Sequence, residues 1–157
     1  MVLKAVRKEV AFLAATASVL LADQAAKLLA RNLENPVVII KGLLSISPEK
    51  NTGAAFSLFP GTSLLLALIG IAVSAAVIIL YKKLPEKTYV KIAAALILAG
   101  TLGNLIDRLI FGYVTDFISL SFWPAFNIAD SALTIGAGLI ILYFARDRFG
   151  KNQSLSQ

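Results

Sequence analysis

The chain has 157 residues, of which 58% are hydrophobic and 15% are charged, and its mean hydropathy is +0.81. This composition excludes an ordinary soluble domain and indicates an integral membrane protein. The sequence contains neither cysteine nor histidine, which excludes disulfides, Cys or His metal sites and Ser-His-Asp triads. We therefore expect no metal and no cofactor, and any acid–base chemistry must use carboxylates, Lys or Tyr.

Four apolar segments follow one another along the chain, at about 10–31, 62–80, 91–110 and 127–145. Each is close to the ~20 residues that a helix needs to cross a hydrocarbon core of ~30 Å. The first segment continues into Asp23 and Lys27 without a small-residue cleavage site, which indicates a retained helix rather than a signal peptide. We predict an all-α bundle of four transmembrane helices that forms a single domain over 1–157, with a disordered tail at 152–157.

The basic residues indicate how the bundle is oriented. The N-terminus, the loop between the second and third spans, and the C-terminal tail together hold ten of the 15 Lys and Arg residues: Lys4, Arg7, Lys8, Lys82, Lys83, Lys87, Lys91, Arg146, Arg148 and Lys151. By the positive-inside rule this side is cytoplasmic, so the loops at about 34–61 and 111–126 face outward. The net charge of +6 is explained by these flanks, and we expect no nucleic-acid partner.

The two outer loops have strand-like patterns. Residues 36–41 and 43–47 are two short β-prone runs on either side of Gly42, and residues 113–120 form a third. Phe122, Trp123 and Phe126 are typical of an aromatic belt where the fourth span enters the membrane. We predict a small extracytoplasmic β-sheet that is partly buried in lipid headgroups.

Polar residues from separate segments converge near the outer ends of the spans. They are Asp23, Lys27, Asn51, Asn104, Asp107, Arg108, Asp116, Asn127 and Asp130, and Gly53 follows Asn51 in the same segment. A charged side chain inside a membrane costs about 2.5–3.5 kcal/mol on insertion scales, and such residues mark a functional site by default. A structural interpretation stays open for part of the set. Asp23–Lys27 and Asp107–Arg108 are candidate ion pairs, and Asn104 and Asn127 are candidate interhelical hydrogen-bonding residues.

Asp116 and Asp130 differ from the other carboxylates because no basic residue lies within four positions of either. Two carboxylates in a poorly hydrated site share one proton, since both cannot ionise comfortably. The ionised member can then activate water while the protonated member polarises a carbonyl, which is the aspartic mechanism of peptide hydrolysis. Perturbed carboxylates in an ion pathway are the alternative at this point.

Five blocks of the sequence resemble the lipoprotein signal peptidases (signal peptidase II), and together they extend over nearly the whole chain. These blocks are Asp23–Lys27, Asn51–Phe56, Gly103–Arg108, Gly112–Phe117 and Phe126–Ser131. The resemblance implies an aspartic endopeptidase of the bacterial inner membrane. Its substrates would be prolipoproteins whose cysteine carries diacylglycerol, and it would cut immediately before that cysteine. Globomycin-type cyclic peptides would inhibit it.

The resemblance also implies a role for each polar residue. Asp116 and Asp130 match the catalytic dyad. Five residues match substrate-contacting or dyad-supporting positions, namely Asn51, Gly53, Asn104, Arg108 and Asn127. Asp23, Lys27 and Asp107 are expected to give structural support. Because the complete site lies in one chain, we expect a monomer that contacts membrane lipids.

Three other functions are alternatives for a membrane bundle with these polar residues. A transporter is disfavoured because the polar residues gather near one membrane face, so that no relay crosses the bilayer. A non-catalytic membrane scaffold predicts that Asp116→Asn leaves activity intact. A Ser–Lys peptidase would pair Lys27 with a serine such as Ser57, but no serine shares the helix face of Lys27 at its outer end.

Overall fold

The computed structural model describes residues 2–53 and 61–154, with side chains at 7–53 and 61–148. This part of the chain contains four long helices, α1 (Val2–Arg31), α2 (Ser63–Leu80), α3 (Thr88–Phe111) and α4 (Ile128–Ser154), and a short 3-10 helix, η2 (Tyr81–Lys83). All four long helices are long and apolar enough to cross a membrane, which confirms the predicted spans. Because α4 continues to Ser154, residues 152–154 of the expected disordered tail are helical, and 155–157 lie outside the described residues.

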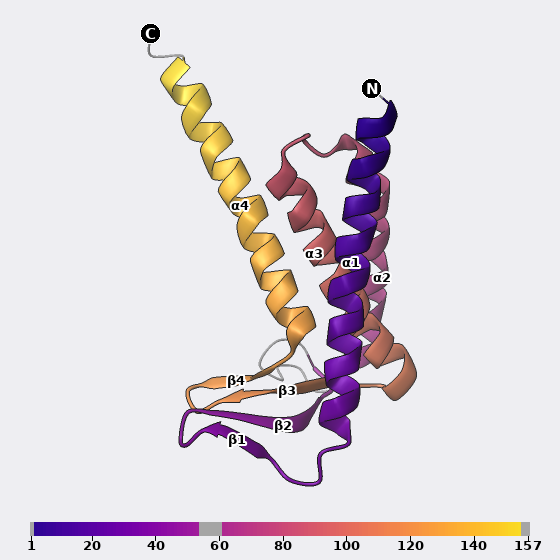
Figure 1. Ribbon diagram of the computed structural model, residues 1–157, viewed down its shortest axis with the longest axis vertical. Helices are drawn as coiled ribbons and strands as arrows, with labels where there is room; N and C mark the ends of the chain where they lie inside the picture. The colour runs from indigo at the N-terminus through magenta and orange to yellow at the C-terminus, as the bar shows by residue number, and fades with distance from the viewer. Residues whose placement is uncertain (1, 54–60, 155–157) are drawn as a thin grey trace.

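Helix α3 occupies the centre of the bundle, because α1, α2 and α4 each pack against it. Figure 1 shows α4 close to the other helices where it begins and well separated from α1 where it ends. The close crossing of α3 and α4 depends on glycines. A Cβ at Gly100 would collide with the carbonyl oxygen of Ala129, and a Cβ at Gly136 would lie 2.9 Å from the carbonyl oxygen of Ala93. The two backbones therefore approach more closely than side chains would allow.

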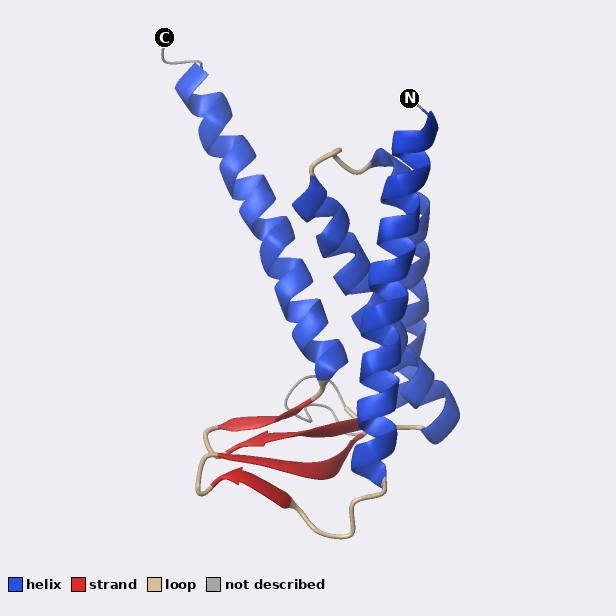
Figure 2. Ribbon diagram, viewed as in Figure 1, coloured by secondary structure: helices blue, strands red, loops and turns tan. Residues whose placement is uncertain are grey.

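An antiparallel sheet covers one end of the bundle, which we call the sheet end (Figure 2). Its strand order is β1 (Val37–Ile40), β2 (Leu44–Asn51), β3 (Val114–Leu120) and β4 (Trp123–Phe126). Gly42, with a φ of 74°, turns the chain from β1 to β2, because this left-handed conformation is available to glycine at little cost. The predicted strands are thus confirmed. The sequence does not predict β4, because its residues are typical of an aromatic belt.

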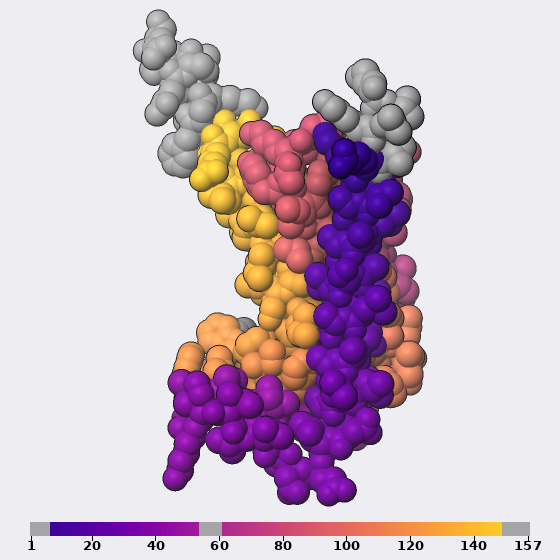
Figure 3. Space-filling model, in the orientation of Figure 1, coloured from indigo at the N-terminus to yellow at the C-terminus, as the bar shows by residue number. Residues whose placement is uncertain are grey.

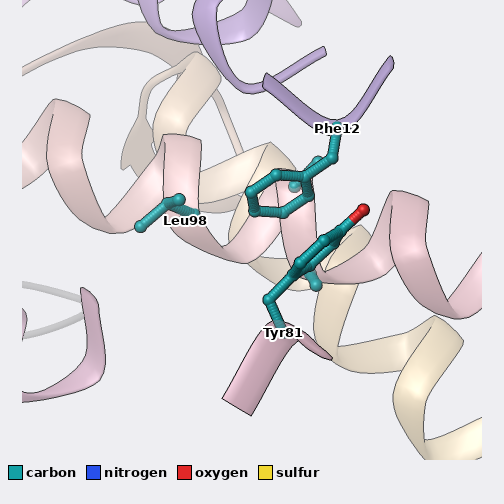
Figure 4. Packing of buried hydrophobic residues seen from close by; sticks show 5 residues of the cluster. Phe12, Tyr81 and Leu98 are labelled. Carbon is teal, nitrogen blue, oxygen red and sulfur yellow. The ribbon is translucent and has the colours of Figure 1, made fainter. Parts of the chain in front are cut away.

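At the opposite end, which we call the termini end, α1 begins and α4 ends (Figure 1). A small apolar cluster joins α1, η2 and α3 here. The rings of Phe12 and Tyr81 lie 4.1 Å apart between centroids, and Leu98 packs in the same cluster (Figure 4). This packing fixes α1 against the start of α3. The polar residues predicted to form the site lie toward the sheet end.

Candidate active site

Asp116 and Asp130 come from different elements, and side-chain amides contact both. Asp116 lies in β3 and is 3% exposed, while Asp130 lies in the first turn of α4. Asn51 donates to Oδ2 of Asp116 at 2.9 Å, and Asn127 donates to Oδ1 at 2.7 Å. Asn104 donates to Oδ1 of Asp130 at 2.7 Å. The structure therefore brings three of the five residues predicted to surround the proposed dyad, Asn51, Asn104 and Asn127, into contact with it.

Asn127 links the two aspartates because it also caps α4. Its Oδ1 accepts a hydrogen bond from the backbone N–H of Asp130 at 2.9 Å, and its own backbone N–H donates to Oδ2 of Asp130 at 3.2 Å. This reciprocal arrangement is a capping box, in which two otherwise free N–H groups of a helix start are satisfied. Since the amide nitrogen of Asn127 donates to Asp116, the cap of α4 also determines where Asp130 lies relative to β3.

The segment after β2 contacts a cation of α3 beside the site. The backbone N–H of Gly53 donates to Oδ1 of Asn51 at 3.0 Å, which leaves the amide nitrogen of Asn51 to face Asp116. Arg108 of α3 donates from Nη2 to the carbonyl oxygen of Gly53 at 3.2 Å. The predicted residues Gly53 and Arg108 therefore contact each other beside the dyad, while residues 54–60 lie outside the described part of the chain.

The environment of Asp116 favours its protonated form. Burial raises the pKa of this carboxyl from 3.8 to about 6, and the charge of Asp130 raises it as well. The hydrogen bonds from Asn51 and Asn127 act in the opposite direction, because they stabilise the ionised form. A carboxyl with this pKa exchanges its proton near neutral pH, as general acid–base chemistry requires.

Lys27 has no exposed surface and contacts Asn104, a residue that donates to Asp130. Its Nζ is 2.9 Å from Asp23 and 3.5 Å from Asp107, and it donates to Oδ1 of Asn104 at 3.0 Å. Asn127 donates to the same oxygen at 3.2 Å. With two donors on its oxygen, the amide of Asn104 must turn its nitrogen toward Asp130. The buried lysine thus orients a residue that contacts the proposed dyad.

Asp23 extends this support to the start of α4. Its Oδ1 accepts a hydrogen bond from the backbone N–H of Ala129 at 2.8 Å, so a side chain of α1 satisfies a free N–H group of another helix. The carboxylate passes Gly103 of α3, where a Cβ would lie only 2.7 Å from Oδ2 of Asp23. The glycine is therefore required for α1 and α4 to meet across α3.

Asp107 fixes β3 instead of pairing with its neighbour in sequence. Its Oδ2 accepts from the backbone N–H of Thr115 at 2.8 Å, and its Oδ1 lies 3.4 Å from Nη1 of Arg31. The candidate ion pair Asp107–Arg108 is wrong, because successive residues of a helix point about 100° apart and only those three or four positions apart face each other. Asp107 pairs with Lys27 and Arg31, while Arg108 contacts Gly53.

Comparisons with known proteins extend over most of the chain. The sequence matches the family described as signal peptidase (SPase) II over residues 15–146. The lipoprotein signal peptidase of Halothermothrix orenii is 41% identical over 128 residues, which cover 80% of this chain and 88% of that protein. The one of Pseudomonas aeruginosa is 43% identical over 122 residues, covering 71% and 72%. The chain belongs to the signal peptidase II family.

A solved structure supports the same family. It is titled a bacterial membrane enzyme, is 31% identical to this chain and has a TM-score of 0.83, with coverage of 90% of this chain and 91% of that one. A second structure with the same title words is 32% identical, with a TM-score of 0.78. The chain is therefore a membrane peptidase of the signal peptidase II family in a bacterial membrane, rather than a transporter or a scaffold.

In this signal peptidase II chain, a cavity of about 880 Å³ leads away from the two aspartates. Its polar part is formed by Asn51, Asn104, Arg108, Asp116 and Asp130. Its remaining walls are largely apolar and come from α2, α3, α4 and β4, including Leu66, Ile69, Val73, Leu105, Leu133 and Phe126. The cavity thus joins ionisable groups to an apolar surface formed by membrane-spanning helices.

Sequence reasoning missed two supporting residues and the apolar wall. Arg31 donates to Oγ1 of Thr115 at 2.9 Å, next to Asp116 in the chain. The signal for Arg31 was present, because Asp23, Lys27 and Arg31 are spaced four residues apart and so share one face of α1. The wall on α2 carried no such signal, since nearly every residue of that helix is aliphatic.

Proposed function

We propose that this chain is an aspartic endopeptidase that removes signal peptides from prolipoproteins. The relatives with which it shares 41–44% identity are named lipoprotein signal peptidases. The single observation that carries the aspartic mechanism is the bridge that Asn127 forms between the carboxylates of Asp116 and Asp130, donating to one from its side-chain amide and to the other from its backbone N–H. One residue contacts both carboxylates, and these are the only two acids that the sequence left without a basic neighbour.

The reaction follows from two carboxyl groups that share one proton. The ionised carboxylate takes a proton from water, and the water oxygen attacks the carbonyl carbon of the scissile peptide bond. The protonated carboxyl donates to the carbonyl oxygen, so that a tetrahedral diol forms without a separated charge. When the diol collapses, the C–N bond breaks and the leaving amine receives a proton from the dyad. Asn51, Asn104 and Asn127 keep the two carboxyl groups in the geometry for both steps.

The cavity supports a substrate that is both peptide and lipid. Its polar end at Asp116 and Asp130 suits the scissile bond, and its apolar walls on α2, α3 and α4 suit an aliphatic signal sequence and acyl chains. We propose that cleavage occurs on the N-terminal side of a cysteine that carries diacylglycerol. Arg108 and Gly53 lie beside the dyad, where they contact the substrate backbone. Asp23, Lys27 and Asp107 give structural support through their buried ion pairs.

The basic flanks support an orientation in the bacterial inner membrane. Both termini and the loop after η2 would be cytoplasmic, and the sheet end with the two aspartates would lie near the outer face. In this position water reaches the dyad while the lipid part of the substrate stays in the bilayer. The chain would act as a monomer without metal or cofactor, and globomycin-type peptides would block the dyad.

The test is cleavage of one prolipoprotein with and without diacylglyceryl on its cysteine, using the purified chain in lipid nanodiscs. Mass spectrometry of the product identifies the new N-terminus. We expect a single cut immediately before the modified cysteine and at least about tenfold slower cleavage of the unmodified precursor, since the acyl chains would lose their apolar contacts. Equal rates for the two precursors, or a cut elsewhere, would contradict the proposed specificity.

A further inference from the structure

A second, smaller cavity lies at the termini end of the bundle, away from the two aspartates. It has a volume of about 100 Å³ and lies between α1 and α3. One part of its lining is apolar and comprises Ala11, Phe12, Ala15, Ile92 and Ala95. The other part includes the charged residues Lys8, Glu86 and Lys91. An apolar slot bordered by ammonium groups is a combination that the proposed peptidase reaction does not use.

Two lysines from different helices converge on one carboxylate beside this slot. Lys8 of α1 donates to Oε2 of Glu86, and Nζ of Lys91 of α3 lies 3.4 Å from Oε1. The hydrogen bonds from these lysines lower the pKa of Glu86, which is therefore ionised at neutral pH. The two ammonium groups are thus spaced to hold a monoanion through two of its oxygens.

The carboxylate is the replaceable member of this group. The Glu86 side chain is 67% exposed, and ion pairs of exposed side chains are weak because water screens them. Lys91 has other contacts that keep it in place, because it donates to the carbonyl oxygen of Tyr81 at 2.9 Å and lies 4.3 Å from the centroid of that ring. Two lysines and one carboxylate also leave one positive charge at the slot.

The boundary between α1 and α3 is open to the surroundings at this end. Figure 3 shows the first turns of α3 at the surface between α1 and the separated end of α4. Both helices are of membrane-spanning length and the slot lies near the start of both spans, so it would lie where acyl chains meet the headgroups of one leaflet. The phosphodiester of a phospholipid is a monoanion with two free oxygens, and a basic site between transmembrane helices is a known type of site for anionic headgroups.

We infer that the slot binds an anionic phospholipid of the leaflet at the termini end. The phosphate takes the place of the Glu86 carboxylate between Lys8 and Lys91, and an acyl chain lies along Ala11 and Ile92. This inference does not depend on the proposed aspartic mechanism, because none of these residues contacts the aspartates. It requires only that the helices span a membrane.

The test is native mass spectrometry of the full chain released from nanodiscs of equal parts phosphatidylglycerol and phosphatidylcholine. We expect the wild-type chain to retain phosphatidylglycerol preferentially. Lys8→Gln should reduce its retention by up to about fivefold, and Glu86→Gln should increase it by a similar factor, since a competing surface ion pair is removed. Two matched variants carry the same charge changes on exposed residues of this end outside the slot, namely Lys82→Gln and Glu9→Gln.

Three results would overturn the inference. Reduced or unchanged retention in Glu86→Gln would show that the carboxylate only joins the helices, and an equal rise in Glu9→Gln would show general charge attraction. Ala11→Phe fills the slot without changing the charge and should abolish the preference. Soluble glycerophosphoglycerol, which has the headgroup without chains, should not compete. Equal competition would point to a phosphate site instead of a lipid site and would also overturn the inference. Thermal melting confirms that each variant is folded.

Discussion

Asn127 and Asp130 cap the start of α4 reciprocally, each accepting a hydrogen bond from the backbone N–H of the other, at 2.9 and 3.2 Å. The local rule that begins a helix therefore also sets the position of a proposed catalytic carboxylate. Because the side-chain nitrogen of Asn127 is directed to Asp116, capping and the geometry of the dyad depend on the same residue.

This double role can be separated by substitution. Asn127→Ser keeps an N-cap oxygen but removes the donor to Asp116. We expect the rate of cleavage to fall by about 10- to 100-fold, since a hydrogen bond to a charged group contributes about 1.5–3 kcal/mol, with little change in melting temperature. Asn127→Ala should lose about 1 kcal/mol of stability in addition. Equal cleavage by Asn127→Ser and the wild type would show that the contact with Asp116 is not needed.

Lys27→Met removes the only cation within 4 Å of Asp23 that the described residues provide, and leaves Asp107 with Arg31 as its partner, at 3.4 Å. Breaking a fully buried ion pair costs about 3–5 kcal/mol because a charge is left uncompensated. We expect a large loss of folded protein, measured by thermal melting and by yield from the membrane. Lys82→Met, on an exposed residue, is the control and should have little effect. A stable but inactive Lys27→Met protein would instead assign the lysine to the site itself.

The raised pKa of Asp116 gives a pH dependence of stability. Because the folded chain binds this proton more tightly than the unfolded chain, the stabilising contribution is present below the ordinary value of 3.8 and is lost as the pH rises through about 6. As the pH rises from 3.8 to about 6, the melting temperature of the wild type should therefore fall relative to that of Asp116→Asn, which has no carboxyl group to titrate at this position. Glu49→Gln, on the exposed part of β2, is the control. The same slope in wild type and Asp116→Asn would show that another group is responsible.

The glycines of α3 and α4 provide a matched test of helix packing. Gly100→Ala places a Cβ against the carbonyl oxygen of Ala129, which belongs to the backbone and cannot turn away. We expect a loss of about 1–3 kcal/mol, as for other overpacked positions, and slower cleavage because the start of α4 is displaced. Gly138→Ala, where no atom lies within 4 Å of the new Cβ, should be neutral or stabilising. Comparable melting temperatures for the two variants would contradict this account of the packing.

The sequence allowed the spans, the β-prone loops and the two isolated aspartates to be predicted, because each depends on local composition or spacing. Hydrophobic runs report a membrane environment, and the lack of basic neighbours distinguished Asp116 and Asp130. The partners of buried charges were not predictable in this way. Asp107 was matched to Arg108, although its partners Lys27 and Arg31 lie on another helix.

The strand β4 and the second role of the α4 cap were not predictable either, because both depend on contacts between distant segments. β4 is a four-residue strand containing Pro124, and its formation depends on pairing with β3 rather than on its own residues. The capping box of α4 has the required spacing in sequence, Asn127 followed by Asp130, but nothing in that spacing indicates that the amide also contacts a strand. Contacts between distant segments decide these features, so they became visible only in the structure.

In the proposed mechanism, Asp116 and Asp130 together hydrolyse the peptide bond. The most direct measurement is cleavage of a diacylglyceryl-modified prolipoprotein by the purified wild type, by Asp116→Asn and by Asp130→Asn, with thermal melting to confirm folding. Because each aspartate transfers a proton in the reaction and asparagine cannot do so, we expect turnover in the wild type alone. Retained turnover in either folded variant would contradict it.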